Sequence, residues 1–205
     1  MTLPSLRMTV FYTLFPLLVF ISACAVEKED DGSIQSVLRP QLSELGAGNW
    51  LVISEAAFPI QSRRGLDVIQ LDADIPELVD TVEQVIEETY HIKPRIYLTT
   101  EIEHVEYDYA PGVSNYRKKL KESLHGRETL KLDHDILLSI LKDTSKSYRV
   151  LVIKSRTALP YSSVFMELDS GYWGTESESA LRRAMEKSAL PKPDLSPTTI
   201  PELNP

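Results

Sequence analysis

The feature of this sequence that most constrains its fold is the alternation of short apolar runs with segments of helical periodicity. Apolar runs of strand length occur at residues 50–53, 67–71, 95–100, 148–154 and 163–168. Apolar spacing and capping residues predict helices at residues 37–45, from Asp74 to about Ile86, and at 114–124, 135–142 and 176–187. Strands that alternate with helices bury their apolar faces when the helices pack on a sheet. We therefore expect an α/β domain.

Local signals refine this expectation at three places. Ser36 is the predicted cap of the first helix, with Pro40 in its first turn, and Asp74 is the predicted cap of the second. The segment 155–162, between the last two apolar runs, has room for a hairpin with a loop. The sequence thus predicts that the last two strands are neighbours in the sheet.

Residues 1–23 are similar to a secretory signal peptide and are not expected to belong to the fold. A single charge, Arg7, precedes sixteen uncharged residues that end at Ala23. This length is short for a membrane span of about 20 residues and suits the apolar region of a signal peptide. The region ends in Ile21-Ser22-Ala23-Cys24, and Cys24 is the only cysteine of the chain.

The small residues before Cys24 resemble the lipobox of bacterial lipoproteins. The resemblance implies cleavage before Cys24 and acylation of that residue, palmitate included, and two or three acyl chains anchor a protein stably where one does not. Ala25 rather than aspartate after the cysteine implies the outer membrane, facing the periplasm, and residues 24–33 are expected to form a polar tether. A plain signal peptide, or a short membrane helix with a buried cysteine, remains the alternative.

The other end of the chain is also expected to lie outside the fold. Residues 191–205 contain five prolines with few apolar residues between them. Proline at this density can neither continue a helix nor donate to a sheet, so we expect an extended or disordered tail. The domain is therefore predicted at residues 34–190.

Composition excludes several classes of function. The net charge of −8 argues against a nucleic-acid binder, which needs a basic face, and a single cysteine excludes a disulfide framework or a cysteine-built zinc site. The sequence has no phosphate loop, no nucleophile elbow and no metal-ligand spacing, so we expect no cofactor and no metal. His134, in Asp133-His134-Asp135, could mark a metal half-site, but a helix start is the favoured interpretation. The acidic run at residues 101–108 is interpreted as a solvated loop.

Two segments resemble the D-ribose pyranase and L-fucose mutarotase (RbsD/FucU) family. Leu45-Gly46-Ala47-Gly48-Asn49, followed by the run from Val52 to Pro59, is similar to the family's opening turn, first strand and the motif that follows the strand. The stretch from Val152 to Ser163 is similar to the family's closing hairpin with its tyrosine-containing tripeptide. The resemblance covers about residues 33–168 and implies the family's fold and its ring-shaped assembly with sites at subunit contacts.

The resemblance also implies a function and a site. Family members interconvert anomers or ring forms of a monosaccharide, which requires proton transfer by an acid or base within hydrogen-bond reach. Carried over by position, the sugar-binding residues are Ala47, Asn49, Glu55, Tyr161 and Ser163. Glu55 and His134 are the catalytic candidates, although the match of His134 requires several extra residues before the closing hairpin.

The departures from the family pattern lie in the chemistry-bearing positions. The family's proton-donating histidine is Ala47 here, the acidic residue after it is Asn49, and the asparagine of the closing motif is Ser163. The family's aspartate is Glu55, and Tyr161 is kept. Because alanine cannot carry a proton, we expect ring interconversion to be reduced or lost unless Glu55 or His134 compensates, for example through a pKa raised by burial.

Each site residue also has an ordinary structural interpretation. Glu55 can be a surface residue at a strand end, Tyr161 a turn residue packed on the sheet, and Ser163 a plain strand residue. The turn that holds Ala47 and Asn49 can simply end a helix through a left-handed glycine. Four aromatic residues could stack on a sugar but are more often found in cores or subunit contacts: Tyr107, Tyr109, Tyr116 and Trp173.

Two functions therefore remain as hypotheses. The first is a membrane-anchored, monosaccharide-binding homo-oligomer with reduced or altered isomerase activity. The second is a non-catalytic structural or interaction lipoprotein of the cell envelope that retains the old fold. An unrelated enzyme on an α/β scaffold has no supporting motif in the sequence.

Overall fold

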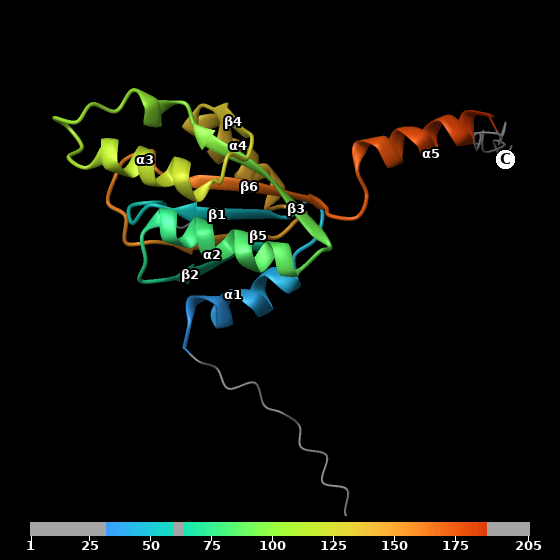
Figure 1. The fold of residues 1–205 in the computed structure, drawn as a ribbon, viewed down its shortest axis with the longest axis horizontal. Helices are drawn as coiled ribbons and strands as arrows, with labels where there is room; N and C mark the ends of the chain where they lie inside the picture. The colour runs from blue at the N-terminus through green and yellow to red at the C-terminus, as the bar shows by residue number, and fades with distance from the viewer. Residues whose placement is uncertain (1–31, 60–63, 188–205) are drawn as a thin grey trace, which may run out of the picture. The chain divides into compact units, whose positions relative to one another are not determined.

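A six-stranded mixed sheet lies at the centre of the computed structural model, which describes residues 32–59 and 64–187 (Figure 1). The strands are β1 Trp50–Ser54, β2 Leu66–Gln70, β3 Ile92–Thr99, β4 Thr129–Leu132, β5 Val150–Lys154 and β6 Val164–Ser170. The helices are α1 Ile34–Ser43, α2 Ile75–Glu88, α3 Val113–Ser123, α4 His134–Thr144 and α5 Thr175–Lys187, with a short 3₁₀ helix η1 at Glu101–Glu103. The expected α/β class is confirmed.

The central part of the sheet is built around β1, which is buried along its whole length. Leu51 and Ile53 face a core cluster that includes residues of α1, α2 and α3, whereas Trp50 and Val52 face a second cluster that includes residues of α4. In Figure 1, α2 crosses in front of the sheet. A strand covered on both faces is a continuous apolar run rather than an alternating one, and β1 was recognisable in the sequence for this reason.

Five of the six strands run in the same direction. The strand order is β2-β5-β1-β6-β3-β4, and only β6 is antiparallel to its neighbours β1 and β3. β1 and β2 pair in parallel with β5, and β3 pairs in parallel with β4. The carboxyl ends of these five strands therefore lie at one edge of the sheet, together with the beginning of β6, and we call this the carboxyl edge.

The hairpin predicted for residues 155–162 is wrong. β1 lies between β5 and β6, so the segment passes over the end of β1 instead of turning directly back. Ser155 donates its backbone N–H to the carbonyl of Ser54 at 3.0 Å, which fixes the start of the crossing. Strands two places apart in a sheet are only about 10 Å apart, so a segment long enough for a hairpin loop is equally able to make this step.

The helix caps also differ from the sequence prediction. Ser33, not Ser36, caps α1, accepting the Ser36 N–H at 3.2 Å, and the helix begins early enough that Pro40 lies inside it. Asp74 occupies the cap position of α2, but its carboxylate accepts from Arg156 at 3.1 Å and does not cap the helix. The hydroxyl of Thr157 accepts the first N–H of α2 instead, from Ile75 at 3.0 Å, so the crossing segment itself caps the helix.

The predictions for the other elements are confirmed in position, with one strand missed. β4 was not predicted because it has only four residues, two of them exposed, at the edge of the sheet. The last helix was predicted and is observed as α5, in which no residue is buried.

Cys24, which is expected to be lipidated, the segment 1–23 and the tail 191–205 lie outside the described residues, as does nearly all of the expected tether 24–33. The signal peptide, the lipid anchor and the disordered tail therefore remain predictions. Among the helices that the structure does describe, none combines the length and the apolar character that crossing a bilayer requires.

Candidate functional site

Glu55 is the first residue after β1 and lies at the carboxyl edge with only 9% of its surface exposed. Because β6 is antiparallel to β1, the residue that precedes β6 lies beside it. Ser163 donates its hydroxyl to a carboxylate oxygen of Glu55, and the Glu55 N–H donates to the same hydroxyl oxygen at 3.2 Å. Two residues 108 positions apart in the sequence are thus held together by a reciprocal pair of hydrogen bonds.

Burial raises the pKa of Glu55 above its ordinary value of 4.5. Desolvation is the largest cause, because a carboxylate loses its hydration in a protein interior. Hydrogen bonding to the backbone N–H of Glu55 and the nearby charges of His134 and Lys154 act in the opposite direction and lower the pKa in part. A carboxyl group in this environment is better suited to exchange a proton near neutral pH than an exposed glutamate is.

Tyr161 and His134 form an aromatic pair next to Glu55. Their rings meet edge to face, with centroids 5.4 Å apart and planes at 85°. Tyr161 has a left-handed backbone (φ 58°), a conformation that costs a non-glycine residue about 1–3 kcal/mol. Its carbonyl accepts the hydroxyl of Thr99, the last residue of β3, at 2.7 Å, so the strained turn is fastened to the sheet.

His134 begins α4, which confirms the helix start that the sequence favoured. Both carboxylate oxygens of Glu101 accept its backbone N–H, at 2.9 and 3.1 Å. A carboxylate at a helix N-terminus satisfies an otherwise unpaired donor and complements the helix dipole. Nδ1 of His134 is buried without a hydrogen-bond partner among the described residues. The backbone of His134 is thus fixed by Glu101, and its imidazole packs against Tyr161.

Glu101 belongs to the acidic run that was interpreted as a solvated loop, and the structure modifies that interpretation. Residues 101–103 form η1, with Ile102 buried, and Arg117 of α3 donates to the carbonyls of Ile102 and Val105 at 2.6–2.8 Å. Glu103 pairs with Lys131 of β4. The run is therefore fastened to α3, α4 and β4, and only part of it is a free acidic surface.

A hollow of about 450 Å³ opens at this edge of the sheet. Its lining comes from the segment after β3, the residue before α4 and the turn before β6: Thr100, Glu101, His104, Val105, Asp133 and Tyr161. In open α/β sheets, ligands bind outside the carboxyl ends of the strands. The hollow and the cluster of Glu55, Ser163, Tyr161 and His134 lie at this edge and share Tyr161, so we take them together as the candidate site.

Tyr116 supports the site from behind and does not form part of its surface. Of the four aromatic residues considered for sugar stacking, it is the one that lies in the core. Its hydroxyl donates to the carbonyl of Ser162, and burial together with the charge of Glu55 raises its pKa. Tyr107 and Tyr109 are exposed, and Trp173 donates its indole N–H to Glu178 at 2.8 Å.

Ala47 and Asn49 lie at the opposite end of β1. The turn from Gly46 to Asn49 is closed by the Gly46 N–H, which donates to the Asn49 side-chain oxygen at 2.7 Å, and by the Asn49 N–H, which donates to the Gly46 carbonyl at 3.1 Å. Gly48 has φ +85°, which a residue with a side chain rarely adopts. The five residues of β1 separate this turn from Glu55 by roughly 17 Å at the usual rise per residue.

The structure thus brings together some of the sequence-predicted residues and separates others. Glu55, Tyr161, Ser163 and His134 gather at the carboxyl edge. Ala47 and Asn49 do not join them within one chain. The supporting roles of Thr99 and Glu101 were not predicted, although polar residues at the end of the apolar run of β3 were a usable signal.

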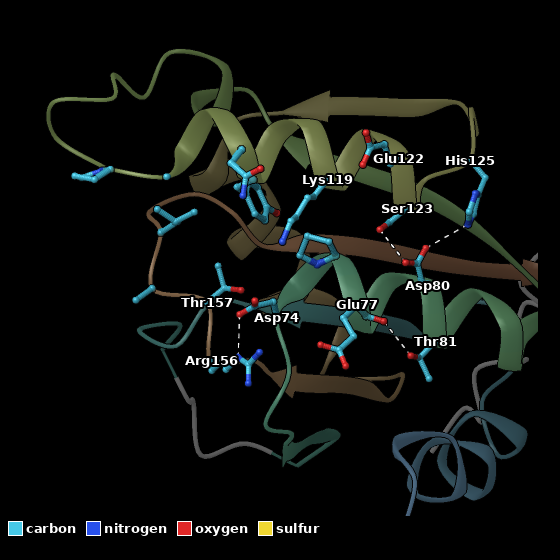
Figure 2. A pocket seen from close by; sticks show the side chains of 17 residues that line it. Asp74, Glu77, Asp80, Thr81, Lys119, Glu122, Ser123, His125, Arg156 and Thr157 are labelled. Atoms are coloured by element: carbon cyan, nitrogen blue, oxygen red, sulfur yellow. Dashed lines mark hydrogen bonds and ion pairs between the residues drawn. The ribbon is translucent and has the colours of Figure 1, made fainter.

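A larger hollow lies elsewhere, between α2, α3 and residues 156–159 (Figure 2). It has a volume of about 720 Å³, and none of the sequence-predicted site residues lines it. Figure 2 shows that much of its charge is paired internally, with Arg156 on Asp74, and with His125 and Ser123 both on Asp80. Size alone therefore does not make it the candidate site.

Metal binding receives no support from the part of the chain that the structure describes. Within residues 32–59 and 64–187, no three histidine, cysteine or carboxylate side chains are grouped so that they could hold a metal ion. The chemistry available at the carboxyl edge is that of a buried carboxyl, a hydroxyl, a phenol and two imidazoles.

Most of the chain matches the sequence profile of a known family. The sequence profile of the RbsD / FucU transport protein family matches residues 28–170. The chain belongs to this family. The match runs from just before α1 to the last residue of β6 and leaves α5 outside, so the carboxyl edge and the turn that holds Ala47 both belong to the RbsD/FucU part.

Solved structures of the RbsD/FucU type are similar to this chain at low identity. RbsD of Bacillus subtilis complexed with D-ribose is 20% identical, with 67% of this chain and 94% of that chain covered and a TM-score of 0.45. The fucose mutarotase of Streptococcus pneumoniae in complex with L-fucose is 18% identical (65% and 91% covered, TM-score 0.45), as is FucU from Bifidobacterium longum (65% and 93%, TM-score 0.44). No curated protein matches the chain significantly.

Proposed function

We propose that this protein binds a monosaccharide at the carboxyl edge of its sheet and interconverts the sugar's ring forms slowly. The observation that carries the proposal is the meeting of Glu55, Ser163, Tyr161 and His134 at one edge of the sheet, where Tyr161 lines a hollow. A sugar presents hydroxyls that donate and accept hydrogen bonds, and this edge offers a carboxyl, a hydroxyl and a phenol as partners. Membership of a family named for ribose and fucose proteins supports a monosaccharide of that kind.

Glu55 is the residue that we assign to proton transfer. Ring opening removes the proton of the anomeric hydroxyl while the bond between the anomeric carbon and the ring oxygen breaks, and that oxygen takes up a proton. The Glu55 carboxylate accepts the first proton and returns it when the ring closes on the other face. Its raised pKa and its hydrogen bond from Ser163 suit this role, because the group is held in place and gains and loses a proton readily.

The position of Ala47 is the reason we propose that the activity is low. By resemblance, a family histidine that carries a proton would stand there, and a methyl group carries none. General acid or base catalysis contributes about 10²–10⁴-fold in rate, so the loss of one such group leaves most of the rate missing. If no exchange remains at all, the protein is a non-catalytic binding or interaction lipoprotein, which is the second candidate function.

We also propose that the sugar site is completed between copies of the chain. Ala47 and Asn49 lie at one end of β1 and Glu55 at the other, so one copy cannot bring them together. A head-to-tail contact places one end of a copy against the opposite end of the next, and such contacts generate rings when they close. Light scattering of the full chain in detergent is expected to show a multiple of the monomer mass, and a clean monomer would contradict a shared site.

The membrane anchor belongs to the same proposal and rests on the sequence before Cys24. Acylation of Cys24 would hold the domain at the periplasmic face of the outer membrane through residues 24–33. Intact-protein mass spectrometry is expected to show a chain that begins at Cys24 and carries acyl groups. A Cys24→Ser variant that fractionates with membranes as the native chain does would contradict the anchor.

The deciding experiment measures binding and exchange separately. Saturation-transfer NMR with ribose, fucose and galactose tests binding to the full chain in detergent, and exchange spectroscopy on the same samples compares ring-form interconversion with that in buffer. We expect at least one sugar to bind and to exchange faster than in buffer. Glu55→Gln should retain binding and lose exchange, whereas Glu87→Gln, an exposed carboxyl on α2, serves as the matched control. The absence of binding to all three sugars would contradict the proposal.

A further inference from the structure

The proposed reaction needs a second proton carrier besides Glu55, one that can reach the ring oxygen of a bound sugar. Glu55 is 9% exposed and can serve one side of the sugar only. His134 is poorly placed for this, since its Nδ1 is enclosed and its ring rests edge to face on Tyr161. Besides Tyr161, the titratable groups that line the hollow are Glu101, which caps α4, His104 and Asp133.

His104 differs from the other groups in the hollow because its backbone is fixed while its imidazole is exposed. It follows η1, and its N–H donates to the Glu101 carbonyl at 2.9 Å. Arg117 holds the carbonyls of Ile102 and Val105 on either side of it. The ring makes no hydrogen bond or ion pair with another described residue, so both of its nitrogens are available to a ligand.

We propose that His104 is a catalytic residue of the sugar site and carries the proton that reaches the ring oxygen. This inference rests on the proposed function. Imidazole gains and loses a proton near neutral pH, which matches the requirement for a group that must donate and then recover one. His104 and Tyr161 line the same hollow, so a sugar held against the phenol lies within the space that the imidazole borders.

The step balances without a further reactant. The protonated imidazole of His104 gives its proton to the ring oxygen as the bond to the anomeric carbon breaks, and Glu55 takes the proton of the anomeric hydroxyl. The open-chain sugar then rotates about the bond next to its carbonyl carbon. Closure reverses both transfers: Glu55 returns its proton to the anomeric oxygen, and His104 recovers the proton from the attacking hydroxyl. The enzyme leaves the cycle in its starting state.

The charges around His104 come from η1, β4, α3 and the residue before α4. Glu101 and Glu103 belong to η1, with Glu103 paired to Lys131 of β4, and Asp133 lies before α4. Arg117 of α3 is engaged with backbone carbonyls. Tyr161 also lines the hollow. The pH dependence of the exchange rate is therefore expected to depend on the imidazole and on these neighbouring carboxylates.

The test compares His104→Gln with His125→Gln in the full chain in detergent, with ribose, fucose and galactose as the probes. His125 is also exposed, but it lines the hollow between α2 and α3 and pairs with Asp80. We expect His104→Gln to change the Kd of the bound sugar less than about threefold, the size of one lost hydrogen bond or less. Its exchange rate should fall about 100-fold or to the value in buffer. We expect His125→Gln to behave as the native protein.

The pH profile supplies the readout that a structural role would not move. The pH profile of the exchange rate in His104→Gln is expected to differ in shape from that of the native protein. Native-like exchange in His104→Gln, with sugar still bound, would overturn the role of His104 and leave the proposed function standing. Sugar binding without any exchange in the native chain would overturn it as well, and no binding at all would overturn both proposals.

Discussion

Both ends of β1 lie within the region that matches the RbsD/FucU family, but their structures are very different. At the carboxyl edge, Glu55 is buried, bonded to Ser163 and close to His134 at the start of α4 and to Lys154 at the end of β5. At the opposite end, the turn with Ala47 is closed by its own Asn49, and Ala47 faces solvent. The carboxyl edge holds a carboxyl group in a fixed position, whereas the opposite end exposes the methyl group of Ala47.

This difference shows that the two ends of β1 carry different energetic costs. Holding a buried carboxyl costs desolvation energy, and a strained Tyr161 costs backbone energy, so such features persist only where the surrounding structure over-determines them. The turn at Ala47 carries no comparable cost. A site completed by a second copy would lose its proton carrier at the turn without any change in the fold, because the Ala47 side chain is exposed and the turn is held through its backbone, with the Gly48 N–H on the Leu168 carbonyl at 2.8 Å.

The largest effect is expected from Ala47→His, which places an imidazole in the turn that precedes β1. Because Ala47 is exposed, the substitution should change stability by less than about 0.5 kcal/mol. If copies meet head to tail, the sugar exchange rate should rise about 10²-fold or more. Exchange spectroscopy checks this, with Ser43→His on the same surface as the control. An unchanged rate in a variant that still binds sugar would separate the two ends of β1 functionally.

The next effect in size is expected from Glu55→Gln at the carboxyl edge. The amide keeps the shape and can still bond to Ser163, but it cannot exchange protons, so the exchange rate should fall about 100-fold. Sugar affinity measured on the same sample should change by less than about 1.5 kcal/mol, the usual range for one altered hydrogen bond. A variant that exchanges the sugar as fast as the native protein would move the chemistry away from Glu55.

The strands and helices were largely predictable because they depend on local patterns. The apolar runs of β1 and β5 and the capping and periodicity of α2 identify themselves in the sequence, whereas β4 has too few residues and too little burial to do so. The order of the strands was not predictable locally. Whether β6 pairs with β5 or crosses β1 is decided by which strand takes the buried centre, and the segment 155–162 is compatible with both.

The site was predictable in its members but not in its arrangement. Glu55, Tyr161 and Ser163 follow from motifs, and their meeting follows from the antiparallel pairing of β1 with β6. The supporting contacts, such as Thr99 on the Tyr161 carbonyl and Glu101 on the N-terminus of α4, depend on where β3 ends relative to β6 and α4. That relation is set by the whole sheet, and no local pattern encodes it.

Effects of intermediate size are expected from a matched pair of variants, one at each end of β1. Asn49→Ala removes the bond that closes the turn, and Thr99→Val removes the bond that holds the Tyr161 carbonyl. Each should lower the free energy of unfolding by about 1 kcal/mol in urea titrations. Sugar affinity should fall several-fold in Thr99→Val. In Asn49→Ala it should fall only if the turn contributes to a shared site, so equal affinities for the native chain and both variants would contradict a site at either end.

The smallest effect concerns stability and pH. Because burial raises the pKa of Glu55, the folded protein holds this proton at pH values where the unfolded chain has released it. The stabilisation from that proton is fully present below the ordinary pKa of 4.5 and is lost as the pH rises through the folded value. Glu83 on α2, whose pKa burial also raises, acts in the same direction despite its bond to Arg127.

Urea unfolding of the native protein and of Glu55→Gln across this pH range isolates the contribution of Glu55, since Glu83 is common to both. The native protein should lose stability relative to the variant as the pH rises, and parallel curves would show that the carboxyl edge is more hydrated than its burial indicates.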